Sequence, residues 1–328
     1  MRAKSLLIFI GAIFFAAGLG SGASAAQKAA EKKMITMGSA SVGGSLQLAS
    51  SAWATFIMKH NPDLSVNVEA TGGNLDNYRL VDSGAADIGF SVTTTLYEGK
   101  KGLAWAKGRK LANTNTCIPW YVGLSDIWSL GDKKITKLSD LNGKVITPGP
   151  AAGPANFILR LIVAEFGLKP KRIVNVSWGD ALGQMADGMI DVGLISTISP
   201  FGALKNQELT HKVNYFYLDR ADLERLVKKN PQYSIGTIKK GAYKYLDKDG
   251  ESLAWLASLI CNPKLDSDVV YRLVKTTFDK KGELANTMGE FGRQLSLENA
   301  RFANIVPFHP GAVRYFKEHN IALPKLID

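Results

Sequence analysis

Two apolar stretches decide the fold: Cys117–Trp128 reads CIPWYVGLSDIW and Leu253–Cys261 reads LAWLASLIC. Each is rich in β-branched, aromatic and other apolar residues, which predicts a long buried strand. On both sides of the first stretch, short apolar segments alternate with helical patterns, the order typical of α/β units. We therefore predict an α/β protein of two lobes, between which the chain crosses twice.

The rhythm of short strand, small polar loop and helix predicts a parallel or mixed sheet with helices on both faces. Asn74 and Thr93 or Thr94 are the expected helix caps, and Gly167 is the expected helix stop. The expected strands are 34–38, 64–70, 87–91, 144–148, 172–176 and 192–195. The expected helices are 46–59, 74–82, 156–166, 267–279, 284–288, 297–304 and 312–320. The lobe boundaries follow: 26–122 for the first part of lobe 1, 123–254 for lobe 2 and 255–328 for the return to lobe 1.

The N-terminus has the pattern of a cleaved secretory signal. Arg2 and Lys4 precede the uncharged run LLIFIGAIFFAAGL at 6–19, and Ala23-Ser24-Ala25 follows as a cleavage site. The run is shorter than the ~20 apolar residues that span a bilayer. We expect a signal peptide at 1–25 and export to the periplasm.

Composition excludes several classes of protein. The 328 residues include 40 Lys and Arg, 29 Asp and Glu, four His and two Cys. The basic residues are dispersed and lack the interleaved aromatics of a nucleic-acid groove, so no nucleic acid is expected as partner. The histidines form no i,i+4 pair, so no metal is expected. Gly143-Lys144 is followed by Val145, and the loop at 149–153 gives GxxxG, so nucleotide motifs are absent and no cofactor is expected.

The loops that follow the predicted strands are small, polar and rich in glycine: 39–45, 71–74, 91–94, 149–153 and 196–200. Such loops before helices present free backbone N–H groups, which bind carboxylate or phosphate without a charged side chain. Thr71-Gly72-Gly73-Asn74 fits this best. A tight structural turn is the alternative for any single loop, but several at equivalent strand ends favour a binding cleft that includes Ser196.

Aromatic and histidine side chains are expected to be mainly structural. Trp120, Tyr121 and Trp178 read as core, whereas Trp128, at the end of the first crossing strand, is the best candidate for an aromatic in the cleft. His309 is expected to form a turn before the last helix. No serine-hydrolase motif is present, so no catalytic residue is predicted.

Cys117 begins one crossing strand and Cys261 ends the other. If the two strands are antiparallel neighbours, the sulfurs can meet, and an oxidising compartment permits a disulfide. The alternative is two buried free thiols, and the sequence leaves both open.

The sequence resembles the TAXI solute-binding proteins, the extracytoplasmic receptors of one class of tripartite ATP-independent periplasmic (TRAP) transporters. The resemblance runs from Met34 to about Ile321. It is carried by six elements in order: MGSASVGG at 37–44, TGGNLDNYRLV at 71–81, SGAADIGF at 83–90, LSDLNGKV at 138–145, DGMID at 187–191 and HPGA at 309–312.

The resemblance implies a type II-like periplasmic-binding-protein fold, with a ligand cleft between lobes joined by two hinge strands. It implies small organic anions as ligands, such as glutamate or 2-oxoglutarate, and a TRAP permease as partner. We expect the receptor to be a monomer. The implied contacts are Ser39, Ala40, Gly43, Thr71, Gly72, Gly73, Asn74, Ser91, Thr93, Thr94, Gly149, Ala151, Ala152 and Gly153.

One departure from the family pattern affects the ligand. Relatives often have Gly-Ser-Gly-Thr where this chain has Ala152-Gly153-Pro154, so a serine hydroxyl is missing. An anion here depends on backbone N–H groups, Asn156 or water, and a shorter or less charged acid fits this chemistry. The alternatives to a TRAP receptor are a binding protein of an ATP-driven importer, a sensor component, or an exported enzyme on the same fold.

Overall fold

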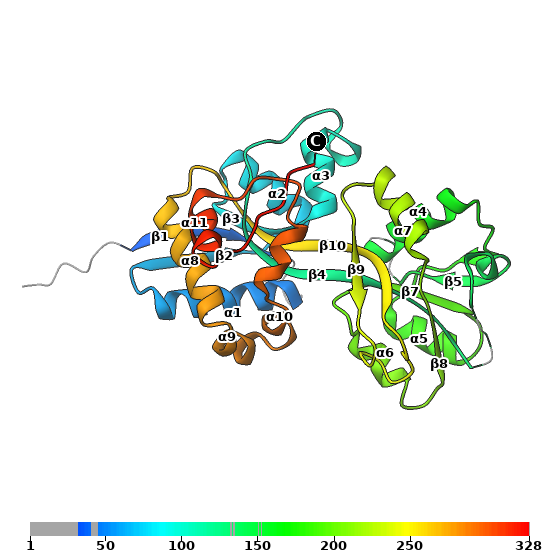
Figure 1. Cartoon of the computed structure of the whole chain (residues 1–328). Helices are drawn as coiled ribbons and strands as arrows, with labels where there is room; N and C mark the ends of the chain where they lie inside the picture. Colours follow the sequence, from blue (N-terminus) through cyan, green and yellow to red (C-terminus); the bar gives the residue numbers. More distant parts are fainter. Residues whose placement is uncertain are drawn as a thin grey trace, which may run out of the picture. The chain divides into compact units, whose positions relative to one another are not determined.

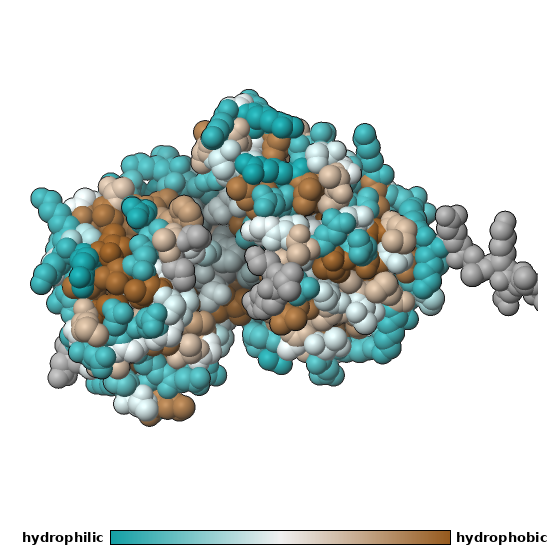
Figure 2. Space-filling model, turned by 180° about the vertical axis from the view of Figure 1, so that it is seen from behind, coloured by the Kyte–Doolittle hydropathy of each residue, from teal (hydrophilic) through white to brown (hydrophobic). Residues whose placement is uncertain are grey.

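The computed structural model describes residues 32–40, 45–131, 133, 135–149, 151 and 153–327. The predicted signal peptide and the predicted contact residues Gly43 and Ala152 lie outside these ranges. Among the helices of these ranges, none combines the length and apolarity needed to cross a bilayer. Polar residues cover most of the face shown in Figure 2, with apolar patches between them.

Two long strands, β4 (Asn115–Leu130) and β10 (Gly250–Cys261), organise the molecule. They pair with each other antiparallel at the centre of the ten-stranded sheet that the described residues form, whose order is β2-β1-β3-β10-β4-β7-β5-β6 (Figure 1). β8 adds to β4 and β9 adds to β10. The predicted α/β fold with two crossing strands is confirmed. The predicted lobe boundaries, at 122/123 and 254/255, fall within these strands and remain a prediction.

Lobe 1 contains the parallel strands β1 (Lys33–Gly38), β2 (Leu64–Glu69) and β3 (Ile88–Val92). Its core packs Trp53 edge-on against Trp120, which also meets Phe90. The helices of this lobe are α1 (Ser45–His60), α2 (Asn74–Ser83), α3 (Thr93–Lys101), α8 (Ser267–Asp279), α9 (Lys281–Met288), α10 (Glu290–Arg293) and α11 (Pro310–Glu318), with 3-10 turns at Ala104–Ala106 and Leu297–Phe302.

Lobe 2 contains β5 (Val145–Thr147), β6 (Arg172–Ile173) and β7 (Val192–Thr197), which are parallel to one another. Its further strands are β8 (Val213–Phe216) and β9 (Ser234–Ile238). Its own apolar cores lie on the sheet and include Leu159 and Leu223. The helices are α4 (Pro154–Phe166), α5 (Trp178–Ala186), α6 (Gly202–Gln207) and α7 (Arg220–Lys229), with a 3-10 turn at Leu138–Leu141.

Helix ends follow local sequence rules, with two corrections. Gly167 ends α4 in the left-handed conformation as predicted, at φ 62°. The predicted caps Asn74 and Thr93 are wrong, because each is the first helical residue and Gly73 and Val92 are the capping residues. Gly73 has φ 104°, a conformation that favours glycine, and α2 begins one residue earlier than a cap at Asn74 would allow.

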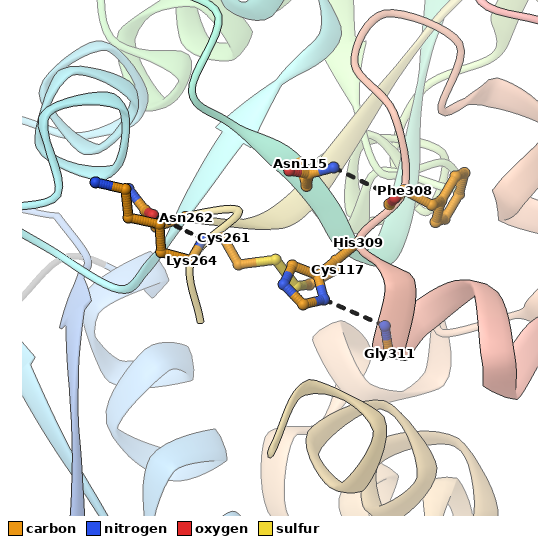
Figure 3. The surroundings of a disulfide bond; sticks show 8 residues. All are labelled: Asn115, Cys117, Cys261, Asn262, Lys264, Phe308, His309 and Gly311. Atoms are coloured by element: carbon orange, nitrogen blue, oxygen red, sulfur yellow. Dashed lines mark hydrogen bonds between the residues drawn. A yellow bond between two sulfur atoms is a disulfide. The ribbon is translucent and has the colours of Figure 1, made fainter. Parts of the chain in front are cut away.

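A disulfide joins Cys117 and Cys261, the bond that the sequence left open (Figure 3). The Cα atoms are 5.9 Å apart, because β4 and β10 are antiparallel neighbours at this end. His309 lies close by, and its Nδ1 accepts a hydrogen bond from the Gly311 N–H at 3.2 Å. His309 thus caps α11, which confirms the predicted structural turn.

The disulfide closes a loop across 144 residues, so its loss should destabilise the fold through the entropy of the unfolded chain. We expect Cys117→Ser together with Cys261→Ser to lower the free energy of unfolding by about 2–4 kcal/mol. Urea denaturation measures this, with reduced wild type as the control. Equal stability of the oxidised wild type and the double variant would contradict the prediction.

Candidate functional site

The strand pairings direct the loops of both lobes toward each other. β3 is antiparallel to β10, with Val92 at its carboxyl end opposite Ala257 and Ile88 at its start opposite Cys261. The carboxyl ends of β1, β2 and β3 therefore point along β10 toward lobe 2. β7 is antiparallel to β4, and Thr197 at its carboxyl end pairs with Leu124. The tips of β5 and β7 consequently point toward lobe 1.

The register of the crossing strands shows how far apart the lobe-1 and lobe-2 strand tips lie along the strand direction. Leu124 pairs with Ala254, which is three residues before Ala257 on β10. Three residues of strand span about 10 Å. Val92 and Thr197 are therefore offset by about this distance along the strand direction, the scale of a small organic molecule.

Adjacent residues of β10 touch a candidate loop on each side. The Leu256 N–H donates to Thr93 Oγ1 at 3.2 Å, in lobe 1. The Trp255 indole Nε1 donates to Ser196 Oγ at 2.8 Å, in lobe 2. The middle of β10 thus positions the loops of both lobes.

Asn77, which sequence reasoning missed, connects the three strand tips of lobe 1. Its Nδ2 donates to the carbonyl oxygens of Ser39 at 2.7 Å and Phe90 at 2.9 Å. Its Oδ1 accepts from Thr71 Oγ1 at 2.7 Å. Asn77 is fully buried, so each of these bonds replaces water that its polar atoms would otherwise need.

The glycines beside Asn77 make room for its side chain. A Cβ at Gly38 would lie 2.6 Å from Asn77 Oδ1, and one at Gly89 would lie 3.0 Å from Asn77 Cβ. Both positions are at or next to strand ends. The glycines therefore permit the close approach that brings the three tips together.

Several predicted contact residues of lobe 1 are engaged within the protein. Ser39 Oγ donates to the Glu69 carbonyl at 2.8 Å and Ser91 Oγ donates to the Asn74 carbonyl at 3.2 Å, and both serines are fully buried. Thr93 is buried as well. The half-buried or exposed members of the predicted set are Ala40, Thr71, Gly72, Gly73, Asn74 and Thr94.

Lobe 2 has a pocket of about 200 Å³ at its own strand tips. It is lined by Pro148, by residues 153–155 at the start of α4, by 195–197 at the end of β7, and by Trp178 and Phe201. The pocket includes the predicted residues Gly153 and Ser196. Ala151 is exposed beside it, in the same loop.

Asn156 and Gly149 shape the loop before α4. Asn156 Nδ2 donates to the Ala151 carbonyl at 2.7 Å, and Asn156 is buried, so its amide holds the loop. Gly149 is buried at φ 69°, and a Cβ there would lie 2.5 Å from the Trp178 indole. Gly149 thus lets the indole lie against the loop.

Trp128 requires a correction. We predicted it as the aromatic of the cleft, but its side chain is fully buried and its Nε1 donates to Gln207 Oε1 at 3.2 Å. It packs over Gly193 on the neighbouring strand, and its place on β4 turns it into the core. The aromatic side chains that line the pocket are Trp178 and Phe201, and the ring centroid of Trp178 lies 5.9 Å from that of Trp128.

A buried carboxylate, that of Asp126, anchors the segment that carries the lining residue Phe201. Asp126 on β4 is 1% exposed and accepts hydrogen bonds from the hydroxyls of Tyr243 at 2.7 Å, Tyr217 at 2.8 Å and Ser199 at 3.3 Å. The Phe201 N–H donates to the Tyr243 hydroxyl at 2.7 Å. Burial raises the pKa of Asp126 above its ordinary value, although the three hydroxyl donors act in the opposite direction. This network fixes the segment that carries Phe201.

Sequence comparison assigns the family. Residues 37–319, most of the chain, match the NMT1-like family. The chain belongs to the NMT1-like family. This family includes the TAXI solute-binding proteins of TRAP transporters, which confirms the resemblance at the level of the family. This NMT1-like protein is a solute-binding protein of a transporter.

The chain is similar to several solved structures, three of which are named here. The aliphatic sulphonate-binding protein SsuA from Escherichia coli has 13% identity and a TM-score of 0.44, over 89% of this chain and 94% of that one. The periplasmic binding protein BugD has 13% identity and a TM-score of 0.46, over 88% and 98%. The alkanesulfonate-binding protein SsuA from Xanthomonas axonopodis pv. citri, bound to MOPS, has 13% identity and a TM-score of 0.40, over 88% and 85%.

Two asparagines of α2 provide a matched test of the lobe-1 arrangement. Asn77→Ala removes three buried hydrogen bonds and leaves a space where the amide lay, so we expect a loss of about 2–4 kcal/mol in the free energy of unfolding. Asn74→Ala alters a half-buried side chain and should change stability by less than about 0.5 kcal/mol. Urea denaturation of both variants measures the difference. Similar losses in both would disprove the role given to Asn77.

Asp126 should make stability depend on pH. Its pKa is raised in the folded state, so its stabilising contribution is present below its ordinary pKa and is lost as the pH rises through the raised value. Asp126→Asn is neutral at all pH values. We expect the wild type to lose stability relative to this variant as the pH rises across that window, measured by urea denaturation at a series of pH values. A pH-independent difference would be inconsistent with this account.

Proposed function

We propose that this protein is a periplasmic receptor that captures a small organic anion between its lobes and delivers it to a TRAP permease. The observation that carries the proposal is the register of β3 and β7 on the crossing strands, which aims the glycine-rich tips of both lobes at one another. In α/β sheets, ligands bind beyond the carboxyl ends of the strands, and here two such edges are opposed.

The lobe-1 tip supplies the contacts for a carboxylate. The first N–H groups of a helix have no partner within the helix, and those of α2 at Asn74, Leu75 and Asp76 follow directly after the glycine turn. Their partial positive charge favours an anion. Asp76 lies in the same turn, and Arg79 Nη1 at 3.7 Å from its carboxylate offsets part of that charge.

Delivery requires that the ligand change the conformation of the receptor. A ligand that touches both lobes stabilises a closed arrangement by its differential affinity for the two states. The closed form of a monomeric receptor would then dock on the permease. The signal-like sequence at 1–25 and the disulfide, which persists in oxidising compartments, support a place in the periplasm.

A binding role is favoured over a catalytic one by what the reactive side chains do. Cys117 and Cys261 are bonded to each other, and buried His309 caps α11. His60 lies 3.0 Å from Glu283 on α9, in lobe 1. Within the described ranges, no group of three His, Cys, Asp or Glu side chains is placed to hold a metal ion.

Binding should depend on the glycine turn. Mass spectrometry of the solute that co-purifies with the native protein identifies the ligand, and calorimetry then gives its affinity. We expect Gly73→Val, which strains the turn at φ 104°, and Asn74→Ala, which removes a side-chain amide donor beside the N–H groups, each to weaken binding by at least about tenfold, or 1.4 kcal/mol. Asn67→Ala, at an exposed position of β2, is the matched control and should leave affinity unchanged. Unaltered affinity in both turn variants would reject the lobe-1 site.

A further inference from the structure

We propose that the ligand is a monocarboxylate with an apolar or aromatic body, and that this body occupies the lobe-2 pocket while the carboxylate meets the start of α2. The inference rests on the proposed function and specifies its substrate class. It is carried by the chemistry of the pocket walls, which differs from that of the lobe-1 tip.

The walls of the pocket are mainly apolar and carry no charged side chain among the described lining residues. Trp178, Phe201 and Ile195 supply side-chain surface, and Pro148 and Pro154 supply more. A second carboxylate placed here would lose its hydration without meeting a cation, and the cost of such burial is several kcal/mol. An apolar group would instead gain free energy by leaving water.

The pocket offers few hydrogen-bond donors. Pro148 and Pro154 have no N–H, and Pro154 occupies the first turn of α4, where an amide would otherwise face an anion. The Asn156 N–H donates to the Gly153 carbonyl at 3.1 Å. The side-chain donors among the described lining residues are the hydroxyls of Ser196 and Thr197 and the indole N–H of Trp178, and none of them is charged. The start of α4 is therefore a poorer anion site than the start of α2.

The electrostatic environment behind the pocket also disfavours a second negative charge. The carboxyl group of Asp126 lies beneath the segment that runs from Ser199 to Phe201, held by the hydroxyls of Ser199 and Tyr243. When ionised, this group repels an anion in the pocket through a medium of low dielectric constant. A neutral body meets no such penalty.

The size and rigidity of the pocket suit one ring or a short branched chain. An apolar cavity of about 150 Å³ is known to bind benzene, and this pocket measures about 200 Å³. Trp178 and Phe201 meet with ring centroids 5.8 Å apart, and Trp128 supports Trp178 from behind. These ring contacts hold the aromatic wall in one arrangement, so little ordering is needed on binding.

The test compares two acids that share a carboxylate and differ in the rest. The exported protein is unfolded in denaturant to remove bound solute and refolded, and calorimetry then measures 3-phenylpropanoate and glutarate. We expect 3-phenylpropanoate to bind at least about tenfold more tightly, the effect of burying one apolar group. Trp178→Ala and Phe201→Ala should weaken 3-phenylpropanoate by at least about tenfold and change glutarate by less than about twofold.

Phe157→Ala is the matched control, because Phe157 is on α4 but 59% exposed and outside the pocket. It should leave both affinities unchanged. Thermal melts followed by circular dichroism verify folding, and if Trp178→Ala does not fold, Phe201→Ala supplies the result. Glutarate binding as tightly as 3-phenylpropanoate would overturn the inference and leave the anion receptor intact. If the co-purifying solute has no carboxylate and neither test acid binds, both the proposed anion receptor and this inference would be overturned.

Discussion

The antiparallel pairing of β4 with β10 is the constraint on which the rest of the structure depends. Both strands also need partners for the N–H and C=O groups that this pairing leaves free; those of β10 come from both lobes, and those of β4 come from lobe 2. β10 pairs with β3 in lobe 1 and with β9 in lobe 2, and β4 pairs with β7 and β8. One continuous ladder therefore fixes the direction of the strands in both lobes, and with it the side on which their loops end.

The two lobes use this shared frame for different chemistry. Lobe 1 gathers its strand tips around the amide of Asn77 and ends in a turn rich in backbone N–H groups. Lobe 2 places Trp178 and Phe201 around a pocket whose flanking prolines lack that donor. This difference in chemistry between the two lobes comes from a few loop residues, since both lobes are built from β/α units. Ligand preference can thus change by loop substitution while the frame stays the same.

Much of the fold could be predicted from the sequence, because apolar runs and glycine stops act locally. The helix at 267–279 has the predicted bounds. The strands β8 and β9 were missed, because short segments beside polar loops gain their order from pairing with β4 and β10. The site was harder. Whether Trp128 faces solvent or core depends on the strand laid beside it, and the bonds of Asn77 join loops far apart in the chain. Neither has a local signal.

Gly123 and Trp255 stand opposite each other on the crossing strands, and the space for a Cβ at position 123 is already filled by the indole, 2.2 Å away. The two positions therefore cannot vary independently. A homologue that retains the tryptophan must retain the glycine, whereas one with a small residue at the equivalent of 255 is free to carry any side chain at 123. Such a homologue would also lack the indole donor to the serine of β7, so its hinge would need a different tie between the crossing and the second lobe.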